Sequence, residues 1–323
     1  MLGLLIERWN GRAWTVQQAP DSPALANSGD TELTSVSCTS TKACIALSTS
    51  RVVRWNGSSW ELQNHALRHG LPGEAVSCGS ATMCVAAGGY QACLSGGCQP
   101  AVVDLERWNG RRWLAQSIPF PRSWSGASLS AVSCSSARAC TAVGSWDPGS
   151  CAPEVCVDVP LVVRWNGSTW SWQKPPQHAA GLGSELLTVS CPSATACVAI
   201  GGGNAAERWN GTSWTIQPLP RKWFATSGAG MAVDCPTDRV CTAINGLSGA
   251  SRWAGSRWSS ERVANPPGLA IGDYVLSGIA CPSVADCFAV GTAYYGLNGN
   301  PGSNSPSTLI EHWHASHWSI QPS

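Results

Sequence analysis

Short apolar segments separated by turn residues follow one another along the whole chain of 323 residues. One complete unit reads Leu186-Leu-Thr-Val-Ser-Cys191, then five turn residues, then Cys197-Val-Ala-Ile-Gly201. It continues with Glu207-Arg-Trp-Asn-Gly-Thr-Ser-Trp214 and a proline-bearing connector. Short β-branched or small segments bounded by turn residues indicate strands, and no window has apolar residues at helical spacing over three turns. The pattern predicts an all-β chain with almost no helix.

The Trp-Asn-Gly-x-x-Trp element predicts a tight hairpin in each unit. Asn-Gly favours a type I′ turn, because both central residues of that turn need positive φ. We name the four expected strands of a unit A (ending at the first cysteine), B (from the second cysteine), C (ending at Asn-Gly) and D (from the second tryptophan). The two tryptophans then face each other across the C–D ladder or pack on the neighbouring unit.

The unit recurs at a period that is typical of propeller blades. The first tryptophan of the hairpin returns at intervals of 46, 53, 57, 44, 44 and 60 residues. A base period of about 44 residues with loop insertions suits a four-stranded blade. The positions are Trp9, Trp55, Trp108, Trp165, Trp209, Trp253 and Trp313. The sequence therefore predicts a single β-propeller domain over residues 1–323.

The number of blades is open, because the chain has seven C–D hairpins but six A–B hairpins. Residues 1–20 contain a C–D half alone, and six full repeats run from about residue 30 to residue 323. The simplest interpretation is a seven-bladed propeller whose first A and B strands lie upstream of Met1. The alternative is a six-bladed propeller with an appended hairpin.

The 16 cysteines fall into pairs, of which six have the spacing Cys-x5-Cys and join strand A to strand B. A zinc site needs about four ligands in one place, whereas each repeat offers one pair, so disulfides are the favoured interpretation. Disulfides imply an oxidising compartment, and we expect a secreted or cell-surface protein although this chain has no signal peptide. The six predicted bridges join Cys38 with Cys44, Cys78 with Cys84, Cys134 with Cys140, Cys191 with Cys197, Cys235 with Cys241, and Cys281 with Cys287. Two shorter pairs join Cys93 with Cys98 and Cys151 with Cys156.

Charge and hydropathy limit the classes of partner that we expect the chain to bind. The chain has 20 Lys and Arg against 19 Asp and Glu, a net charge of +1, and no run of like charge. This composition lacks the basic footprint of a nucleic-acid binder, and no apolar segment is long enough to cross a membrane. We expect a glycan or protein ligand, with no nucleic acid and no membrane insertion.

The variable loops gather on one face of the predicted propeller. From the second cysteine to the strand C tryptophan the chain takes 11 or 12 residues in three units and 24, 25 and 26 in the others. All three insertions are B–C loops, which share a face with the D–A connectors, and two carry the extra cysteine pairs. Aromatic residues outside the repeat fall on this face and are the candidate ligand-binding residues. They are Trp124, Trp146, Trp223, Tyr90, Tyr274, Tyr294 and Tyr295. In the alternative interpretation they only cover the ends of the inner strands.

The other residues with chemically reactive side chains occupy positions of the repeat. His312, His314 and His317 stand where the repeat has Arg, Asn and Ser, so repeat drift explains them and we expect no metal and no cofactor. No carboxylate pair for acid–base work can be picked out, and we expect no enzymatic activity. The recurring arginines before the hairpin tryptophan are interpreted as stacked, solvated strand residues. These are Arg8, Arg54, Arg107, Arg164, Arg208 and Arg252.

In the motifs Leu-x-x-Val-Ser-Cys, Cys-x-Ala-Val-Gly and Arg-Trp-Asn-Gly-x-x-Trp, the chain resembles repeat proteins secreted by actinobacteria, which are grouped with WD40/YVTN/BNR-like propellers. Its C–D hairpin is also similar to that of tectonin-type lectin propellers. The resemblance implies a propeller with a lectin-like, carbohydrate-binding or protein-interaction role. The Ser-x-Asp-x-Gly-x-Thr-Trp box of sialidases is missing. We therefore expect a secreted, non-catalytic recognition module for glycan or protein. The alternative is a polysaccharide-acting propeller hydrolase or lyase.

Overall fold

The computed structural model consists of two compact units, Met1–Pro175 with Ser184–Leu186, and Pro176–Gly183 with Leu187–Ser323. Each unit is described by itself. The residues that the structure describes are 5–20, 33–48, 51–63, 73–90, 93–94, 97–98, 102–121, 124, 126–147, 159–176, 185–202, 205–220, 230–246, 249–269, 273–296, 304–314 and 316–322. Every regular element within these ranges is a β-strand, as the sequence predicts. No helix in them has the length and apolar character needed to cross a membrane.

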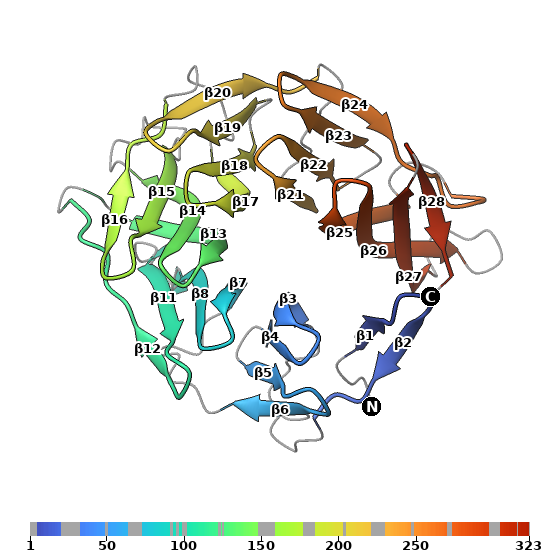
Figure 1. Cartoon of the computed structure of the whole chain (residues 1–323), viewed down its shortest axis with the longest axis horizontal. Helices are drawn as coiled ribbons and strands as arrows, with labels where there is room; N and C mark the ends of the chain where they lie inside the picture. The colour runs from blue at the N-terminus through green and yellow to red at the C-terminus, as the bar shows by residue number, and fades with distance from the viewer. Residues whose placement is uncertain are drawn as a thin grey trace. The chain divides into compact units, whose positions relative to one another are not determined.

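The first unit holds a two-stranded hairpin, three four-stranded antiparallel sheets and a small hairpin inside the first B–C insertion (Figure 1). The first hairpin pairs β1 (Ile6–Trp9) with β2 (Trp14–Gln17). The first sheet is β3 (Leu33–Ser40), β4 (Ala43–Ser48), β5 (Val52–Trp55) and β6 (Trp60–Gln63). The second is β7 (Gly73–Ser80), β8 (Met83–Tyr90), β11 (Val102–Trp108) and β12 (Trp113–Ala115), with β9 (Cys93–Leu94) and β10 (Gly97–Cys98) as the inserted hairpin. The third is β13 (Gly126–Ser136), β14 (Ala139–Asp147), β15 (Val159–Trp165) and β16 (Trp170–Gln173).

The second unit holds three further four-stranded antiparallel sheets. They are β17 (Leu186–Ser193), β18 (Ala196–Gly201), β19 (Ala205–Trp209) and β20 (Trp214–Pro218); β21 (Met231–Thr237), β22 (Val240–Asn245), β23 (Gly249–Ala254) and β24 (Trp258–Arg262); and β25 (Tyr274–Ser283), β26 (Asp286–Gly296), β27 (Asn304–His314) and β28 (His317–Gln321). In each sheet the strands follow chain order from A to D, so every connection within a sheet is a hairpin (Figure 1).

The C–D hairpins form where they were predicted, but the predicted type I′ turn is wrong, because Gly57 has positive φ and Asn56 does not. Trp55 and Trp60 are direct ladder partners, and their rings lie 5.7 Å apart. Gly57 has φ +103°, the left-handed conformation that glycine adopts without strain. Asn56 accepts backbone hydrogen bonds from Ser58 at 2.9 Å and Ser59 at 3.0 Å. The repeated motif thus encodes both the turn and the aromatic pair that flanks it.

Six disulfides close the A–B hairpins, which confirms the local pairing predicted for the Cys-x5-Cys motif. In the first unit they join Cys38 with Cys44, Cys78 with Cys84, and Cys134 with Cys140. In the second unit they join Cys191 with Cys197, Cys235 with Cys241, and Cys281 with Cys287. Within the described residues no cysteine is free.

The two shorter cysteine pairs stay predictions. Cys93 and Cys98 are backbone partners in the β9–β10 ladder, as a local bridge between them requires. Their side chains lie outside the part of the chain that is described. The predicted bridge from Cys151 to Cys156 falls wholly outside the described residues.

The glycine that ends the Cys-x-Ala-Val-Gly segment is required by close backbone packing. A Cβ atom at Gly144 would lie 2.0 Å from the carbonyl oxygen of Ser128, and one at Gly291 would lie 1.9 Å from that of Val275. In both sheets, strand A has a register shift next to the residue that pairs with this glycine. In β13 the shift lies between Leu129 and Ala131. Strand B therefore passes over a bulged strand A, where no side chain fits.

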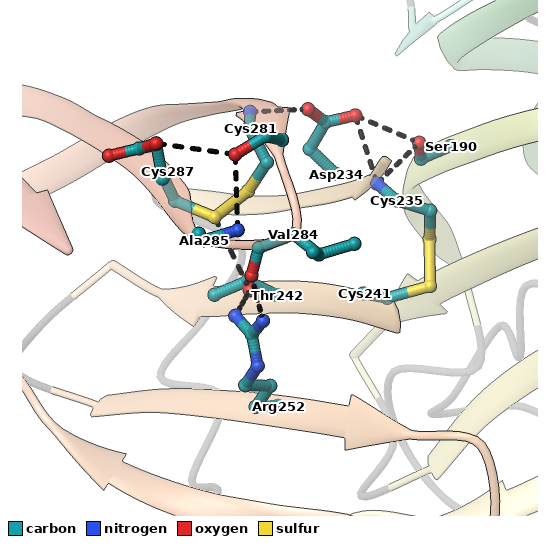
Figure 2. Close-up of a disulfide and its surroundings, with 12 residues drawn as sticks. Ser190, Asp234, Cys235, Cys241, Thr242, Arg252, Cys281, Val284, Ala285 and Cys287 are labelled. Atoms are coloured by element: carbon teal, nitrogen blue, oxygen red, sulfur yellow. Dashed lines mark hydrogen bonds between the residues drawn. A yellow bond between two sulfur atoms is a disulfide. The ribbon is translucent and has the colours of Figure 1, made fainter. Parts of the chain in front are cut away.

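In the A–B half, successive sheets of a unit are joined by hydrogen bonds between a side chain and a backbone amide. The residue before the first cysteine accepts from the amide of the first cysteine in the next sheet. Ser37 accepts from Cys78 at 3.0 Å, and Ser190 accepts from Cys235 at 3.0 Å. Asp234 takes the serine position in its sheet, where it accepts from Cys281 (Figure 2). These bonds satisfy amides on an edge strand.

In the C–D half, the arginine before the tryptophan joins one sheet to the next. Arg8 lies over the Trp55 ring, 5.3 Å from its centroid, and donates to the Thr41 carbonyl at 3.1 Å. Arg252 lies 4.0 Å over Trp313 and donates to the Val284 carbonyl, as Figure 2 shows for the hydrogen bond. Arg107 and Arg208 likewise lie over Trp165 and Trp253. These contacts agree with the interpretation of the arginines as stacked strand residues.

Candidate functional site

Four aromatic side chains form a cluster in the first unit. The rings of Trp124 and Trp146 are stacked, with centroids 4.2 Å apart and planes at 16°. Phe120 lies 5.0 Å from Trp124, and Trp172 meets it edge-on at 5.6 Å. Three different elements supply this cluster: the β12–β13 connector, β14 and β16. We call Phe120, Trp124, Trp146 and Trp172 the aromatic cluster.

The connector is held in shape by its own backbone. Gln116 donates its amide to Leu105 at 2.7 Å, which continues the β11–β12 ladder by one bond. Phe120 then bonds back to Ile118 at 2.9 Å, and Trp124 to Pro121 at 3.2 Å. Phe120, Trp124 and Trp146 also pack against the buried core of the unit. This packing fixes the cluster on the surface of the sheets.

A cleft of about 340 Å³ opens beside the cluster. Its walls come from the start of β11, from the β12–β13 connector and from the start of β13. The lining combines apolar side chains with polar atoms, and Val102 is 56% exposed at its rim. The lining residues are Val102, Val103, Gln116, Ser117, Ile118, Phe120, Pro121, Trp124, Gly126 and Ala127. The cleft therefore lies where a B–C insertion and a D–A connector meet.

Of the other predicted ligand-binding residues, Tyr274 and Tyr294 lie in the second unit. Tyr274 is fully buried, and its hydroxyl donates to Asn265 Oδ1 at 2.8 Å, so packing accounts for it and it offers no surface to a ligand. Tyr294 is 38% exposed on β26. Tyr90 and Tyr295 lie within β8 and β26, because these strands extend into the segments predicted as loops. The side chains of Tyr90 and Tyr295, and the whole of Trp223, lie outside the described part.

The sequence interpretation left Trp172 and Phe120 out of the predicted site. Trp172 stands in strand D two residues after the hairpin tryptophan and is 39% exposed. A large aromatic side chain on the solvent face of an outer strand is a signal that could have included it. Phe120 lies in a D–A connector, and its contact with Trp124 depends on a conformation that the repeat does not encode.

The buried acids do not form a reactive pair. Glu106, Glu207 and Glu311 share one position of strand C in three different sheets, and all are buried. Burial raises the pKa of Glu311 to about 7, although a hydrogen bond from the Ala264 amide at 3.1 Å opposes that rise. The two carboxyl groups of a glycosidase lie across an accessible cleft, whereas these three side chains are buried.

The fold is similar to that of several solved structures. "Structure of U3-55K" superposes with a TM-score of 0.59 at 11% identity, over 90% of this chain and 80% of that one. "Crystal structure of RRP9 WD40 repeats" gives 0.58 at 11% identity, over 90% and 79%. "YCF48 bound to D1 peptide" gives 0.52 at 12% identity, over 89% and 80%. No protein-family model and no curated protein matches the sequence.

The strand pattern and these similarities confirm the predicted fold class: the chain is an all-β propeller of four-stranded antiparallel blades. Six four-stranded blades lie in the described residues, as in the six-bladed alternative. The β1–β2 hairpin stands beside the first sheet as a C–D half without its A–B half. The seven-bladed interpretation stays a prediction.

Proposed function

We propose that the chain is a non-catalytic recognition module that binds a protein ligand in the cleft beside the aromatic cluster. The observation that carries this proposal is the cleft of about 340 Å³, whose lining from Val102 to Ala127 combines apolar side chains with polar atoms. A volume of this order accepts one or two apolar side chains. Protein interfaces are anchored by such side chains in desolvated pockets. One solved structure of similar fold is described as bound to a peptide.

The geometry of Trp124 favours a protein over a glycan. A sugar ring binds to tryptophan by stacking on an open face of the indole. Trp146 is stacked on Trp124 at 4.2 Å, Phe120 is tilted against it and Trp172 meets it edge-on. These three contacts leave Trp124 as a wall of the cleft rather than an open platform. Gln116 and Ser117 supply polar atoms of the lining, which can bond a peptide backbone.

Secretion is the second part of the proposal. Six disulfides within one chain are typical of extracellular proteins, because cytosolic reductants keep thiols reduced. The disulfides also rigidify the sheets that carry the cleft, since the bridges at Cys78 and Cys134 staple the two sheets that line it. A preformed cleft loses less conformational entropy when a ligand binds.

A selection with phage-displayed random peptides on the oxidised protein tests the proposal. We expect enriched peptides to share an apolar or aromatic anchor. Val102→Glu places a charge at the rim of the cleft, and we expect it to weaken a selected peptide by roughly tenfold or more, as at a binding hot spot. The matched control is Val36→Glu on β3, which is 62% exposed and outside the cleft, and which should leave binding unchanged.

Two outcomes would overturn the proposal. Peptides that bind Val102→Glu as tightly as the native chain would place recognition elsewhere on the molecule. Glycans on a printed array that bind through the cleft, with no peptide enriched, would assign it to carbohydrate.

A further inference from the structure

Two histidines and one aspartate meet at the end of the last hairpin of the second unit. His312 Nε2 lies 3.2 Å from Asp286 Oδ1, and His314 Nδ1 lies 2.7 Å from the same oxygen. The three atoms all lie within 4.8 Å of one another. The side chains of these residues are 23%, 36% and 60% exposed for His312, Asp286 and His314. The three side chains are therefore accessible to solvent, and each of them is also partly buried.

The sheet register places these side chains on one face. Asp286 on β26 is the direct ladder partner of His314 on β27. His312 precedes His314 by two residues, and alternate residues of a strand point to the same side. The backbone therefore holds all three groups together, rather than a chance choice of side-chain rotamers.

Neighbouring side chains orient two of the three groups. Ser283 Oγ donates to Asp286 Oδ2 at 3.2 Å, which leaves Oδ1 turned toward the histidines. The ring of Phe288 is stacked on His312, with centroids 4.3 Å apart and planes at 2°. Such outer contacts fix ligand orientation in metal sites and are often as important as the ligands themselves.

The same three positions differ together from the rest of the repeats. No other repeat has an acid at the position of Asp286 or a histidine at the positions of His312 and His314. The position of Asp286 holds Ala43, Met83, Ala139, Ala196 and Val240, and that of His312 holds Arg8, Arg54, Arg107, Arg164, Arg208 and Arg252. Independent drift does not predict that three changes in one unit fall within hydrogen-bond distance of each other.

The change at His314 also removes a residue that stabilises the turn elsewhere. Where a hairpin has asparagine here, its side chain accepts two backbone hydrogen bonds, as Asn10 does from Arg12 at 2.8 Å and Ala13 at 2.9 Å. In the last hairpin His314 instead pairs in the ladder with His317, and Ser316 takes a positive φ of 74°. A conformation that is unfavourable for a non-glycine residue is thus accepted in the turn that presents His314.

We propose that Asp286 Oδ1, His312 Nε2 and His314 Nδ1 bind a divalent first-row transition-metal ion of the zinc class. Imidazole and carboxylate ligands suit Zn²⁺, whereas Mg²⁺ and Ca²⁺ prefer all-oxygen sites. Two ligand atoms about 2.05 Å from a tetrahedral ion are roughly 3.3 Å apart, close to the His312–Asp286 distance of 3.2 Å. The 2.7 Å contact of His314 would lengthen by roughly 0.6 Å, and the exposure of that side chain leaves room for the movement. Three protein ligands keep a fourth position for water or an external donor.

Metal titration of the full oxidised chain tests this assignment. We expect one equivalent of Zn²⁺ by calorimetry, and no measurable binding of Mg²⁺ under the same conditions. The double change His312→Arg with His314→Asn restores the residues that most other hairpins have, so it should fold normally, with an unchanged circular dichroism spectrum. It should weaken Zn²⁺ binding by at least roughly tenfold, and Asp286→Asn should also weaken it.

His317→Ala is the matched control, because it removes a histidine from the same hairpin and keeps the three ligands. Its Zn²⁺ affinity should stay within about threefold of the native value. Binding retained by the double variant would assign the metal to the other histidines, such as His65, His69 and His178, and would overturn the proposal. An equal loss in His317→Ala, or no stoichiometric binding by the native chain, would also overturn it.

Discussion

Within each unit, the A–B and C–D halves of successive blades are joined by different chemistry. In the A–B half a disulfide closes the hairpin, and a hydroxyl or carboxylate accepts from an amide of the next blade, as Ser37 does from Cys78. In the C–D half two tryptophans pack across the turn, and an arginine lies over the tryptophan of the next blade, as Arg8 does over Trp55. One half relies on covalent and polar contacts, the other on aromatic surface.

The difference follows from side-chain size. The A–B strands are rich in Ser, Ala and Gly, and Gly144 leaves no room for even one methyl group against Ser128. Small side chains bury little apolar area, so these strands gain less from the hydrophobic effect. The C–D hairpins bury large indole rings, for example Trp253 and Trp258. Disulfides are thus placed in the half whose side chains are small.

Reduction of all disulfides should cause the largest loss of stability. Each bridge closes a short loop and contributes roughly 2 kcal/mol on the loop-length model, so the six together dominate the stability of the A–B half. We expect a sharp fall in the urea midpoint after reduction and alkylation, measured by tryptophan fluorescence. Replacement of one pair, Cys235→Ala with Cys241→Ala, should cost about one bridge. A reduced chain with an unchanged midpoint would show that aromatic packing alone carries the fold.

Deletion of residues 1–20 removes the C–D half that has no A–B half, and tests how much this hairpin contributes to stability. The β1–β2 hairpin contributes the Arg8 contact with Trp55 and the hydrogen bond to Thr41. We expect its loss to lower the melting temperature by several degrees, because it exposes one side of the first sheet. Arg8→Ala should reproduce part of that loss. A deleted chain that melts as a monomer at the native temperature would favour six blades over seven.

The repeat made the regular parts of the molecule predictable. The Cys-x5-Cys spacing and the Asn-Gly turns specified the strands, their pairing and six disulfides, because each motif acts on its own hairpin. What the sequence could not show is how residues from different elements meet. The stacking of Trp124 on Trp146 depends on a connector that no repeat shares, and the burial of Tyr274 depends on a strand that starts earlier than predicted.

The contact between Asp286 and His314 could not be predicted from the sequence for the same reason. Along the hairpin alone, the histidines look like substituted turn residues. Only the register between β26 and β27 brings Asp286 opposite His314, which is 28 residues further along the chain. Contacts across strands depend on the alignment of such distant segments, which composition and local spacing do not specify.

Asp234 offers an effect of intermediate size, within the polar contacts of the A–B half. It accepts from the Cys281 amide, from Ser190 Oγ at 3.1 Å and from the Cys235 amide at 2.9 Å (Figure 2). Asp234→Ala removes the acceptor of the Cys281 amide and of Ser190 Oγ, whereas the Cys235 amide keeps Ser190 Oγ as an acceptor, and the change should cost about 1–3 kcal/mol. Asp234→Ser restores the residue that other blades have at this position and should cost less. Urea unfolding of both variants at one pH measures the difference.

The pH dependence of the same pair of variants has a defined sign. Burial raises the pKa of Asp234, although the hydrogen bonds from Cys281, Ser190 and Cys235 oppose that rise. The folded chain therefore holds this proton more tightly than the unfolded chain does. As pH rises from the ordinary carboxyl pKa through the raised one, the native protein should lose stability relative to Asp234→Ser. An Asp234→Ser difference that stays constant with pH would show that the carboxyl titrates normally.

The smallest effect is expected for the arginine contact of the C–D half. Arg252 Nη1 donates to Thr242 Oγ1 at 3.0 Å, Nη2 donates to the Val284 carbonyl (Figure 2), and the guanidinium lies over Trp313. A planar, forked donor is needed to make all three contacts at once. Arg252→Lys keeps the charge but loses this geometry, so it should cost about as much as Arg252→Ala, roughly 1–2 kcal/mol. If lysine instead restores native stability in urea unfolding, charge alone would join these two blades.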